Sequence, residues 1–375
     1  MTKNKELREL FRLFLRLGLT AFGGPAAHIA MMQREVVEKR GWMDHQHFLD
    51  LIGATNLIPG PNSTEMAIHI GNERGGWKGM LLAGCCFILP AVLITGVIAW
   101  LYQRYGQLPQ VRPFIYGIKP AIISIILAAV FPLAKRALKS LELVLIAVFA
   151  LGASLLGLNE MAVMFGAGGM VLLMWILRRP GGSLKTLLPL LLLDVPFFSA
   201  ANVRIFLVFL KIGAILYGSG YVLFAFLDSE LVAKGLLTRV QLVDAIAVGQ
   251  FTPGPVFSSV TFVGWQMNGL PGAVMATVAV FLPSFVFVAL LNPLVPVLRR
   301  SKAFSAFLDG VNAASVAIIV AVCVVFARET VTDWRTVLIA VMGLVVTFGF
   351  RKVNTVFVVV GGALAGYLLL LLGQA

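Results

Sequence analysis

The sequence predicts an all-α polytopic membrane protein made of two homologous inverted-topology repeats with broken or re-entrant helices. The first observation behind this prediction is composition: the 375 residues are 59% hydrophobic and only 13% charged, whereas soluble domains carry about 25% charged residues. The second is an internal repeat that runs the length of the chain. The third is a pair of Pro-Gly-Pro motifs, in "LIPGPNSTE" and "FTPGPVFSS", that interrupt apolar segments at matching places.

Runs without Asp, Glu, Lys or Arg supply the predicted membrane spans. The runs 79–103 and 353–375 exceed the roughly 20 residues that cross a bilayer core, and the runs 143–159 and 161–177 only just reach that range. A longer run, 245–298, is also free of charge.

The charged residues argue against a nucleic-acid-binding protein. The net charge is +13, but the basic residues lie between apolar segments, where the positive-inside rule puts them, and form no basic patch with aromatics on a soluble domain. No cleavable signal peptide is evident, because charges are mixed into the first apolar stretch. The neighbouring Cys85 and Cys86 are interpreted as small apolar helix residues, with a soft-metal pair as the less favoured alternative.

The internal repeat keeps its register from end to end. "LRLGLTAFGG" (15–24) aligns with "LKIGAILYGS" (210–219), the two Pro-Gly-Pro motifs align, and Asn159 falls on Asn354. The offset stays near 194 throughout. We therefore predict a first repeat over residues 1–180, a linker over 181–201 that is a candidate extra membrane crossing, and a second repeat over 202–375.

Each half offers six apolar segments, of which the first two, near 8–33 and 48–70 in the first half, carry Gly or Pro breaks. Basic loops alternate in opposite phase in the two halves, which predicts that the halves are inverted in the membrane. Inversion needs an odd number of crossings between the halves. The linker is a poor span because it contains Asp194 and two prolines, so thirteen crossings and ten crossings with two re-entrant hairpins both stay open.

The Pro-Gly-Pro breaks predict an anion site. Unwound backbone at membrane depth costs several kcal/mol per unpaired group unless it lines a water-filled site. After the first break, Asn62 or Ser63 is expected to cap a half-helix, with Glu65 closing a capping box onto Asn62. After the second break, Ser258 and Ser259 offer hydroxyl groups. Helix N-termini carry about half a positive charge and bind anions, so two opposed ones predict a site for a small dianion.

Cations and acids near the breaks are further candidates. Arg16 and Lys211 align and lie seven residues before a Gly-rich break; intramembrane cations face a cavity or a partner, although both residues could instead snorkel to an interface. Lys119 is a third such cation. Glu65 is interpreted either as a capping acid or as a proton carrier, and His69 either as a proton relay or as a partner of local backbone groups.

The predicted substrate-binding residues surround the two Gly-rich breaks and the two Pro-Gly-Pro motifs. In the first half they are Arg16, Gly23, Gly24, Pro25, Asn56, Pro59, Gly60, Pro61, Asn62, Ser63 and Thr64. In the second half they are Lys211, Gly218, Ser219, Gly220, Tyr221, Gln250, Pro253, Gly254, Pro255, Ser258 and Ser259. The proton-coupling candidates are Glu65 and His69. No catalytic residue, metal site or cofactor is predicted; "DHQH" (44–47) has metal-ligand residue types, but a solvated loop explains it more simply.

These motifs resemble the chromate ion transporter family in its long-chain, two-domain form. The resemblance rests on "AFGGPAAHIAMM" (21–32), "LIPGPNSTEMAIHIGNERGGWKG" (57–79), "GSGY" (218–221) and "GQFTPGPVFSSVTFVG" (249–264), and covers essentially the whole chain. It implies chromate efflux and chromate resistance at a prokaryotic inner membrane. Pro25 of the first Gly-rich break is replaced by Gly220 in the second, so the two halves are not equivalent.

Other functions stay open at this stage. The substrate could be sulfate or another tetrahedral oxyanion, and an anion channel would need the same charges without coupling. An intramembrane enzyme would use Glu65 and His69, but no HExxH, Walker A or GxSxG motif is present, so we expect no enzyme. The expected partners are the oxyanion and the lipid bilayer, not nucleic acid, and a homodimer is left open.

Overall fold

The computed structural model describes residues 2–106, 108, 110–178, 201–218, 220–291, 301–350 and 353–372, and within these ranges every regular element is a helix. The first half contains α1 (Thr2–Thr20), α2 (Gly24–Gln33), η1 (Arg34–Lys39), α3 (His45–Thr55), α4 (Asn62–Tyr105), α5 (Arg112–Ala137), α6 (Leu141–Leu155) and α7 (Glu160–Leu177). The second half contains α8 (Ala201–Ile215), α9 (Val222–Leu227), η2 (Asp228–Val232), α10 (Arg239–Phe251), η3 (Val256–Ser258), α11 (Ser259–Leu291), α13 (Lys302–Thr330), α14 (Trp334–Gly349) and α15 (Thr355–Leu372). Except for Ala201, the predicted linker lies outside the described residues.

The two halves repeat the same order of elements, which confirms the predicted fold class. Each begins with a helix that breaks at a glycine of positive φ, Gly23 (103°) or Gly218 (96°). Each then has a short helix, a π-helical turn, a helix that ends at the Pro-Gly-Pro motif, and a long kinked helix followed by three more. Within the described residues, six helices are long and apolar enough to cross a membrane. The chain is therefore a multi-pass membrane protein.

The helix after each Pro-Gly-Pro motif folds back on itself. Gly76 in α4 and Gly269 in α11 have φ of 59° and 57°, and each separates a short first arm from a long second arm. The arms touch: a Cβ at Gly71 would lie only 2.4 Å from the Gly79 carbonyl oxygen, on the other side of the kink. The first arm of α4, 62–75, is about 20 Å long at 1.5 Å per residue, shorter than the roughly 30 Å bilayer core. The first arm alone is therefore too short to span that core, in agreement with the predicted broken or re-entrant helices.

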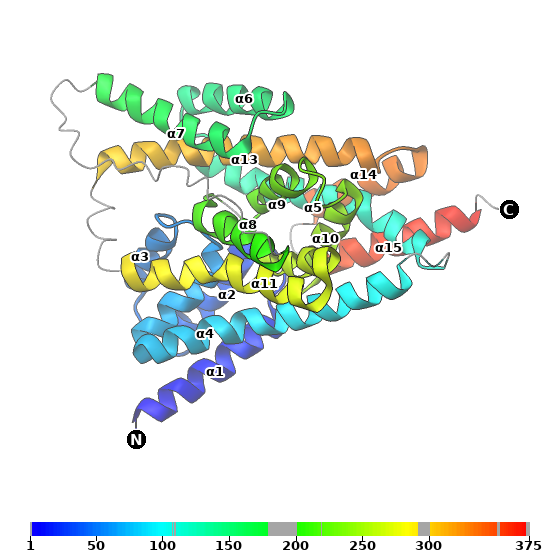
Figure 1. Cartoon of the computed structure of the whole chain (residues 1–375). Coiled ribbons are helices and arrows are strands. Elements are labelled where there is room, and N and C mark those ends of the chain that lie inside the picture. Colours follow the sequence, from blue (N-terminus) through cyan, green and yellow to red (C-terminus); the bar gives the residue numbers. More distant parts are fainter. Residues whose placement is uncertain are drawn as a thin grey trace.

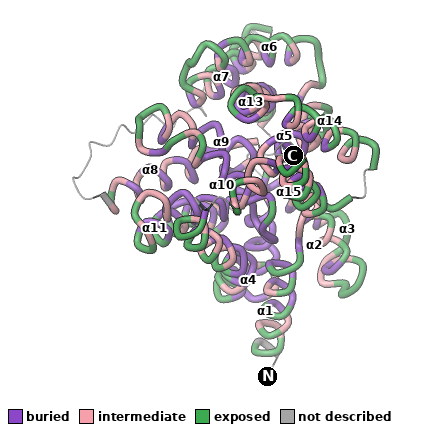
Figure 2. The backbone as a smooth tube through the Cα atoms, turned by 90° about the vertical axis from the view of Figure 1, so that its right-hand side faces the viewer, coloured by how far each residue is buried: buried purple, intermediate pink, exposed green. Residues whose placement is uncertain are grey.

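The later helices of each half pack against helices of the other half. In Figure 1, α13 runs beside α6 and α7, whereas α5 packs against α14 and α15. Glycines permit this close approach, since Gly117 of α5 lies against Gly362 and Gly366 of α15. The long helices α4 and α11 pack against each other. Figure 2 shows the buried residues gathered at the centre of the molecule and exposed ones on outer helices such as α6, where Leu145 and Phe149 present an apolar outer surface.

Candidate functional site

Each Pro-Gly-Pro loop docks its backbone on the opposite half of the protein. The Gly60 N–H donates to the Leu216 carbonyl oxygen at 2.8 Å, and the Gly254 N–H donates to the Ala21 carbonyl oxygen at 2.8 Å. Ala21 and Leu216 each directly follow the first helix of their half. Both glycines have positive φ, 137° and 90°, which other residues rarely adopt. The central backbone N–H of each Pro-Gly-Pro loop is thus satisfied by a carbonyl group of the other half.

The second arms of α4 and α11 hold the loops from another side. A Cβ at Gly60 would lie 2.8 Å from the Ser284 hydroxyl oxygen, and a Cβ at Gly254 would lie 2.9 Å from the Ala91 methyl group. Ala91 and Ser284 each follow a Leu-Pro pair at matching places in the repeat. The loops therefore fit only because their central residue has no side chain.

A buried histidine joins the two breaks. His28 lies with Nε2 3.2 Å from the Ala21 carbonyl oxygen and Nδ1 3.4 Å from the Ser63 hydroxyl oxygen. Because the carbonyl only accepts, Nε2 carries the proton and Nδ1 accepts from Ser63. Ala21 also accepts from Gly254. A continuous chain of polar contacts thus runs from the start of α4 to the second Pro-Gly-Pro loop.

Glu65 lies at the first break and is completely buried. Its Oε1 is 3.5 Å from the Ser284 hydroxyl oxygen of the other half, and it occupies the space beside Gly60 that a Cβ would need. The predicted capping box is wrong. Pro61 occupies the N-cap position of α4 without a side-chain cap, so Asn62 is already in the first turn and instead donates to Asn56 at 2.7 Å.

The second break carries neutral groups in the same places. Ser259 aligns with Glu65, and Ser258 aligns with Thr64. Thr95, from the second arm of α4, lies 3.4 Å from the Ser258 hydroxyl oxygen and 3.5 Å from that of Thr252. Ser284, Thr95 and Thr252 were not predicted, because nothing in the spacing tells which residues of one half face the loop of the other.

Several buried polar atoms at the breaks have no hydrogen-bond partner in the described part of the chain. Leaving such a group unpaired costs about 1–3 kcal/mol, so a cluster of them is typical of a site that binds something. They are Thr64 Oγ1, Glu65 Oε2, both ring nitrogens of His69, Gln250 Nε2 and Ser259 Oγ.

The remaining predicted residues lie close to this cluster. Gly24 lies beside the Tyr221 hydroxyl group, 3.1 Å from where its Cβ would be, and Tyr221 lies 3.5 Å from Gln250 Oε1, so the two Gly-rich breaks also meet. Pro25 lies in the first turn of α2, and Gly220 packs near Phe257. Ser219 lies outside the described residues. The remaining members of the two Pro-Gly-Pro motifs, Pro59, Pro61, Pro253 and Pro255, are all buried.

The candidate cations are ion-paired. Arg16 contacts Glu35 at 2.5 Å, and Lys211 contacts the equivalent Glu230 at 3.1 Å. Both carboxylates lie on the π-helical turns and have further cationic partners, namely Lys39 and Arg40 for Glu35 and Lys234 for Glu230. Lys119 pairs with Asp244 at 3.0 Å. Because these charges are compensated locally, a role of Arg16 and Lys211 in the anion path stays a prediction.

No metal site accompanies these groups among the described residues. No cluster of three or more His, Cys, Asp or Glu side chains in that part of the chain is arranged to hold a metal ion. The "DHQH" segment, which has metal-ligand residue types, begins α3 instead: the Asp44 side chain accepts from the His47 backbone N–H at 2.7 Å and caps the helix.

Comparisons with known proteins agree with the sequence motifs. The profile of the family described as chromate transporter matches residues 8–173 and 203–367. The chain is 34% identical to a chromate transport protein of Cupriavidus metallidurans, covering 96% of this chain and 92% of that protein. It is 30% identical to a probable chromate transport protein of Synechococcus elongatus, covering 96% and 95%, and 30% identical to a chromate transport protein of Pseudomonas aeruginosa, covering 96% and 92%. No solved structure matches the chain.

Proposed function

The chain belongs to the chromate transporter family, and from that premise we propose that it exports chromate across the prokaryotic inner membrane, holding the dianion between its two Pro-Gly-Pro breaks. Family membership makes it a multi-pass membrane transporter and not an enzyme. The direction of transport and the binding residues are the parts that we propose.

One observation carries the proposed site: the polar chain from Ser63 through His28 and Ala21 to Gly254. It brings the N-terminus of the first arm of α4 close to the loop that precedes η3 and α11. Both helix starts present backbone N–H groups that lack intrahelical partners, and such ends favour anions. The unpartnered hydroxyl groups of Thr64 and Ser259 add one donor in each half, at positions that differ by one residue in the repeat.

Glu65 gives this site a link to protons. An ionised carboxylate beside a dianion repels it, and the repulsion is strong where little water screens it. A protonated Glu65 removes the repulsion and adds an O–H donor. Proton binding and dianion binding therefore favour each other, and the two species should cross the membrane together.

This coupling favours export. One proton and one dianion carry a net charge of −1, and each elementary charge gains about 2.3 kcal/mol per 100 mV of potential. An inside-negative membrane potential therefore drives the pair outward, whereas the accompanying proton loses only about 1.4 kcal/mol per pH unit of gradient.

The alternatives differ in measurable ways. The donors at the breaks recognise the oxygen atoms of a dianion rather than chromium, so sulfate or another tetrahedral oxyanion is a second candidate substrate.

An anion channel needs a continuous path, whereas Thr64, Glu65 and Ser259 are fully buried. In proteoliposomes with the membrane potential held at zero, unlabelled chromate or sulfate inside the vesicles accelerates uptake of the labelled anion by a transporter but not by a channel. In a chromate-sensitive bacterium, the protein should raise survival and lower cell-associated chromium; unchanged sensitivity with protein in the membrane would contradict chromate export.

The site itself is tested by straightening the first break. Replacing Pro59 and Pro61 with Ala favours a continuous helix by about 3 kcal/mol per residue and withdraws the helix start from the anion. Chromate should raise the melting temperature of the purified wild type but not that of well-folded proline variants. Pro132→Ala, inside α5, is the matched control and should keep the stabilisation. Equal stabilisation of all variants would contradict the proposed site.

A further inference from the structure

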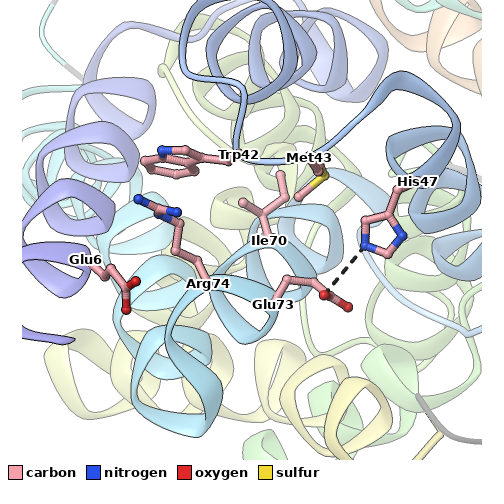
Figure 3. A pocket seen from close by; sticks show the side chains of 7 residues that line it. All are labelled: Glu6, Trp42, Met43, His47, Ile70, Glu73 and Arg74. Atoms are coloured by element: carbon pink, nitrogen blue, oxygen red, sulfur yellow. Dashed lines mark ion pairs between the residues drawn. The ribbon is translucent and has the colours of Figure 1, made fainter. Parts of the chain in front are cut away.

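We propose that a surface pocket beside α3 and the first arm of α4 is a proton port that connects Glu65 to the aqueous phase; this inference rests on the proposed function. The pocket is a cavity of about 190 Å³, which is room for several water molecules at roughly 30 Å³ each. Figure 3 shows the side chains that line it, among them Glu6 from α1, His47 from α3, and Ile70 and Glu73 from α4.

The pocket contains a pair of groups suited to proton exchange. His47 Nε2 lies 3.5 Å from Glu73 Oε2, as the dashed line in Figure 3 marks, and both side chains are partly exposed. The Asp44 cap at the His47 backbone N–H fixes the start of α3 and so the position of the imidazole. An imidazole nitrogen and a carboxylate oxygen can each accept a proton and pass it on.

The charges around the pocket favour protons over the transported dianion. Glu6 and Glu73 line it, and so does Arg74, whose guanidinium group pairs with Glu9 of α1 at 2.9 Å and lies 4.5 Å from the Trp42 ring. The lining thus contains two carboxylates and one guanidinium group. A negatively lined cavity repels a dianion and concentrates positive ions.

A row of titratable side chains leads from the pocket to the proposed anion site. Glu73, His69 and Glu65 are spaced by four residues along the first arm of α4, so they lie on one side of the helix, with about 6 Å of rise between neighbours. Ile70, next to His69, lines the pocket. His69 is 1% exposed, and neither of its ring nitrogens has a partner among the described residues. Single water molecules can bridge steps of this length.

The second half provides an internal comparison. The positions equivalent to His47, Glu65, His69 and Glu73 are Gln241, Ser259, Val263 and Met267. None of these titrates, although the second half forms the same hairpin, kink and Pro-Gly-Pro loop. The fold therefore does not require the four titratable groups, which points to a function that only the first half performs.

The test uses the full-length protein in proteoliposomes, with radiolabelled sulfate as the probe because sulfate stays a dianion at the pH values used, and with chromate in parallel. Two activities are measured: exchange at equal pH on both sides, and uptake driven by an acidic exterior. His47→Gln, which installs the residue of the second half, and the double variant with Glu73→Gln should keep exchange within about twofold. Both should lose at least tenfold in proton-driven uptake.

Glu142→Gln is the matched control, since Glu142 lines another surface pocket and pairs with Arg178 at 2.8 Å; both of its activities should be unchanged. Proton-driven uptake at the wild-type rate in the double variant would overturn the port. So would a wild type that exchanges anions but ignores the proton gradient, a result that leaves anion transport standing. A wild type that exchanges neither chromate nor sulfate would instead refute the proposed function, and the port with it.

Discussion

The two Pro-Gly-Pro breaks share a backbone and differ in chemistry. Both loops use a glycine of positive φ to dock on the other half, with N–H donors 2.8 Å from Leu216 and Ala21. The carboxyl group of Glu65 lies against the first loop at Gly60, whereas the aligned residue of the second half is Ser259, which is also fully buried. The difference teaches that the duplicated backbone builds the site from both halves, whereas proton coupling, in our account, is confined to one.

Substitutions of the two loop glycines should have the largest effect, a loss of stability in both halves. Gly60→Ala adds a methyl group 2.2 Å from Glu65 Oε1, and Gly254→Ala adds one 2.9 Å from the Ala91 methyl group. With backbone strain of about 1–3 kcal/mol added to these overlaps, both variants should lose roughly 3 kcal/mol or more of stability. Thermal unfolding in detergent measures the loss.

Gly152→Ala on α6 is the control, since its Cβ would meet nothing within 4 Å. It should be neutral or slightly stabilising, because Ala is favoured over Gly in a helix by about 1 kcal/mol. Wild-type melting of both loop variants would break the idea that the two loops dock in the same way.

Removing the contacts that His28 makes between the two breaks should have a smaller effect, a loss of anion affinity. His28→Leu, which installs the residue found at the equivalent Leu223, removes the contacts to Ala21 and Ser63. At about 1 kcal/mol for each of the two hydrogen bonds, anion affinity should fall roughly thirtyfold, as isothermal titration calorimetry with sulfate would show. His45→Leu, at an exposed contact with Gln33, should bind normally. An unchanged affinity of the His28 variant would show that anion binding does not depend on the contacts of His28 between the two breaks.

Removing the charge of Arg16 or Lys211 should have the smallest effect on stability and on anion affinity. Arg16 is 50% exposed and Lys211 38% exposed, so solvent screens both pairs and each contributes about 1 kcal/mol or less. Lys211→Gln should destabilise more than Arg16→Gln, because Glu230 keeps one cationic partner and Glu35 keeps two. Anion affinity should change less than threefold in both. A ten- to hundredfold loss would instead support a direct role of these cations in the anion path.

Much of the fold follows from the sequence, because a repeat with a constant offset makes each half evidence for the other. The breaks at Gly23 and Gly218 and the matching order of helices were predicted in this way. The repeat also held an unused signal: Glu35 and Glu230 each follow their cation, Arg16 or Lys211, by 19 residues.

What the sequence could not predict is which half each element contacts. Offsets are identical whether Gly60 docks on its own half or on Leu216 of the other, so the exchanged loops and the contact between Glu65 and Ser284 required the structure. The capping box failed for a local reason: Pro61 in an extended conformation (φ −79°, ψ 94°) already takes the N-cap position. That leaves Glu65 free to turn toward Gly60 and Ser284.

The central claim, that Glu65 must be protonated for the dianion to bind, is tested most directly by sulfate affinity as a function of pH. In the wild type, affinity should fall as pH rises, by up to tenfold per unit once Glu65 ionises in the free protein. Glu65→Gln cannot ionise and should bind sulfate at alkaline pH as tightly as the wild type does at acid pH, with no pH dependence. The same pH dependence in both proteins, measured by calorimetry, would contradict the account.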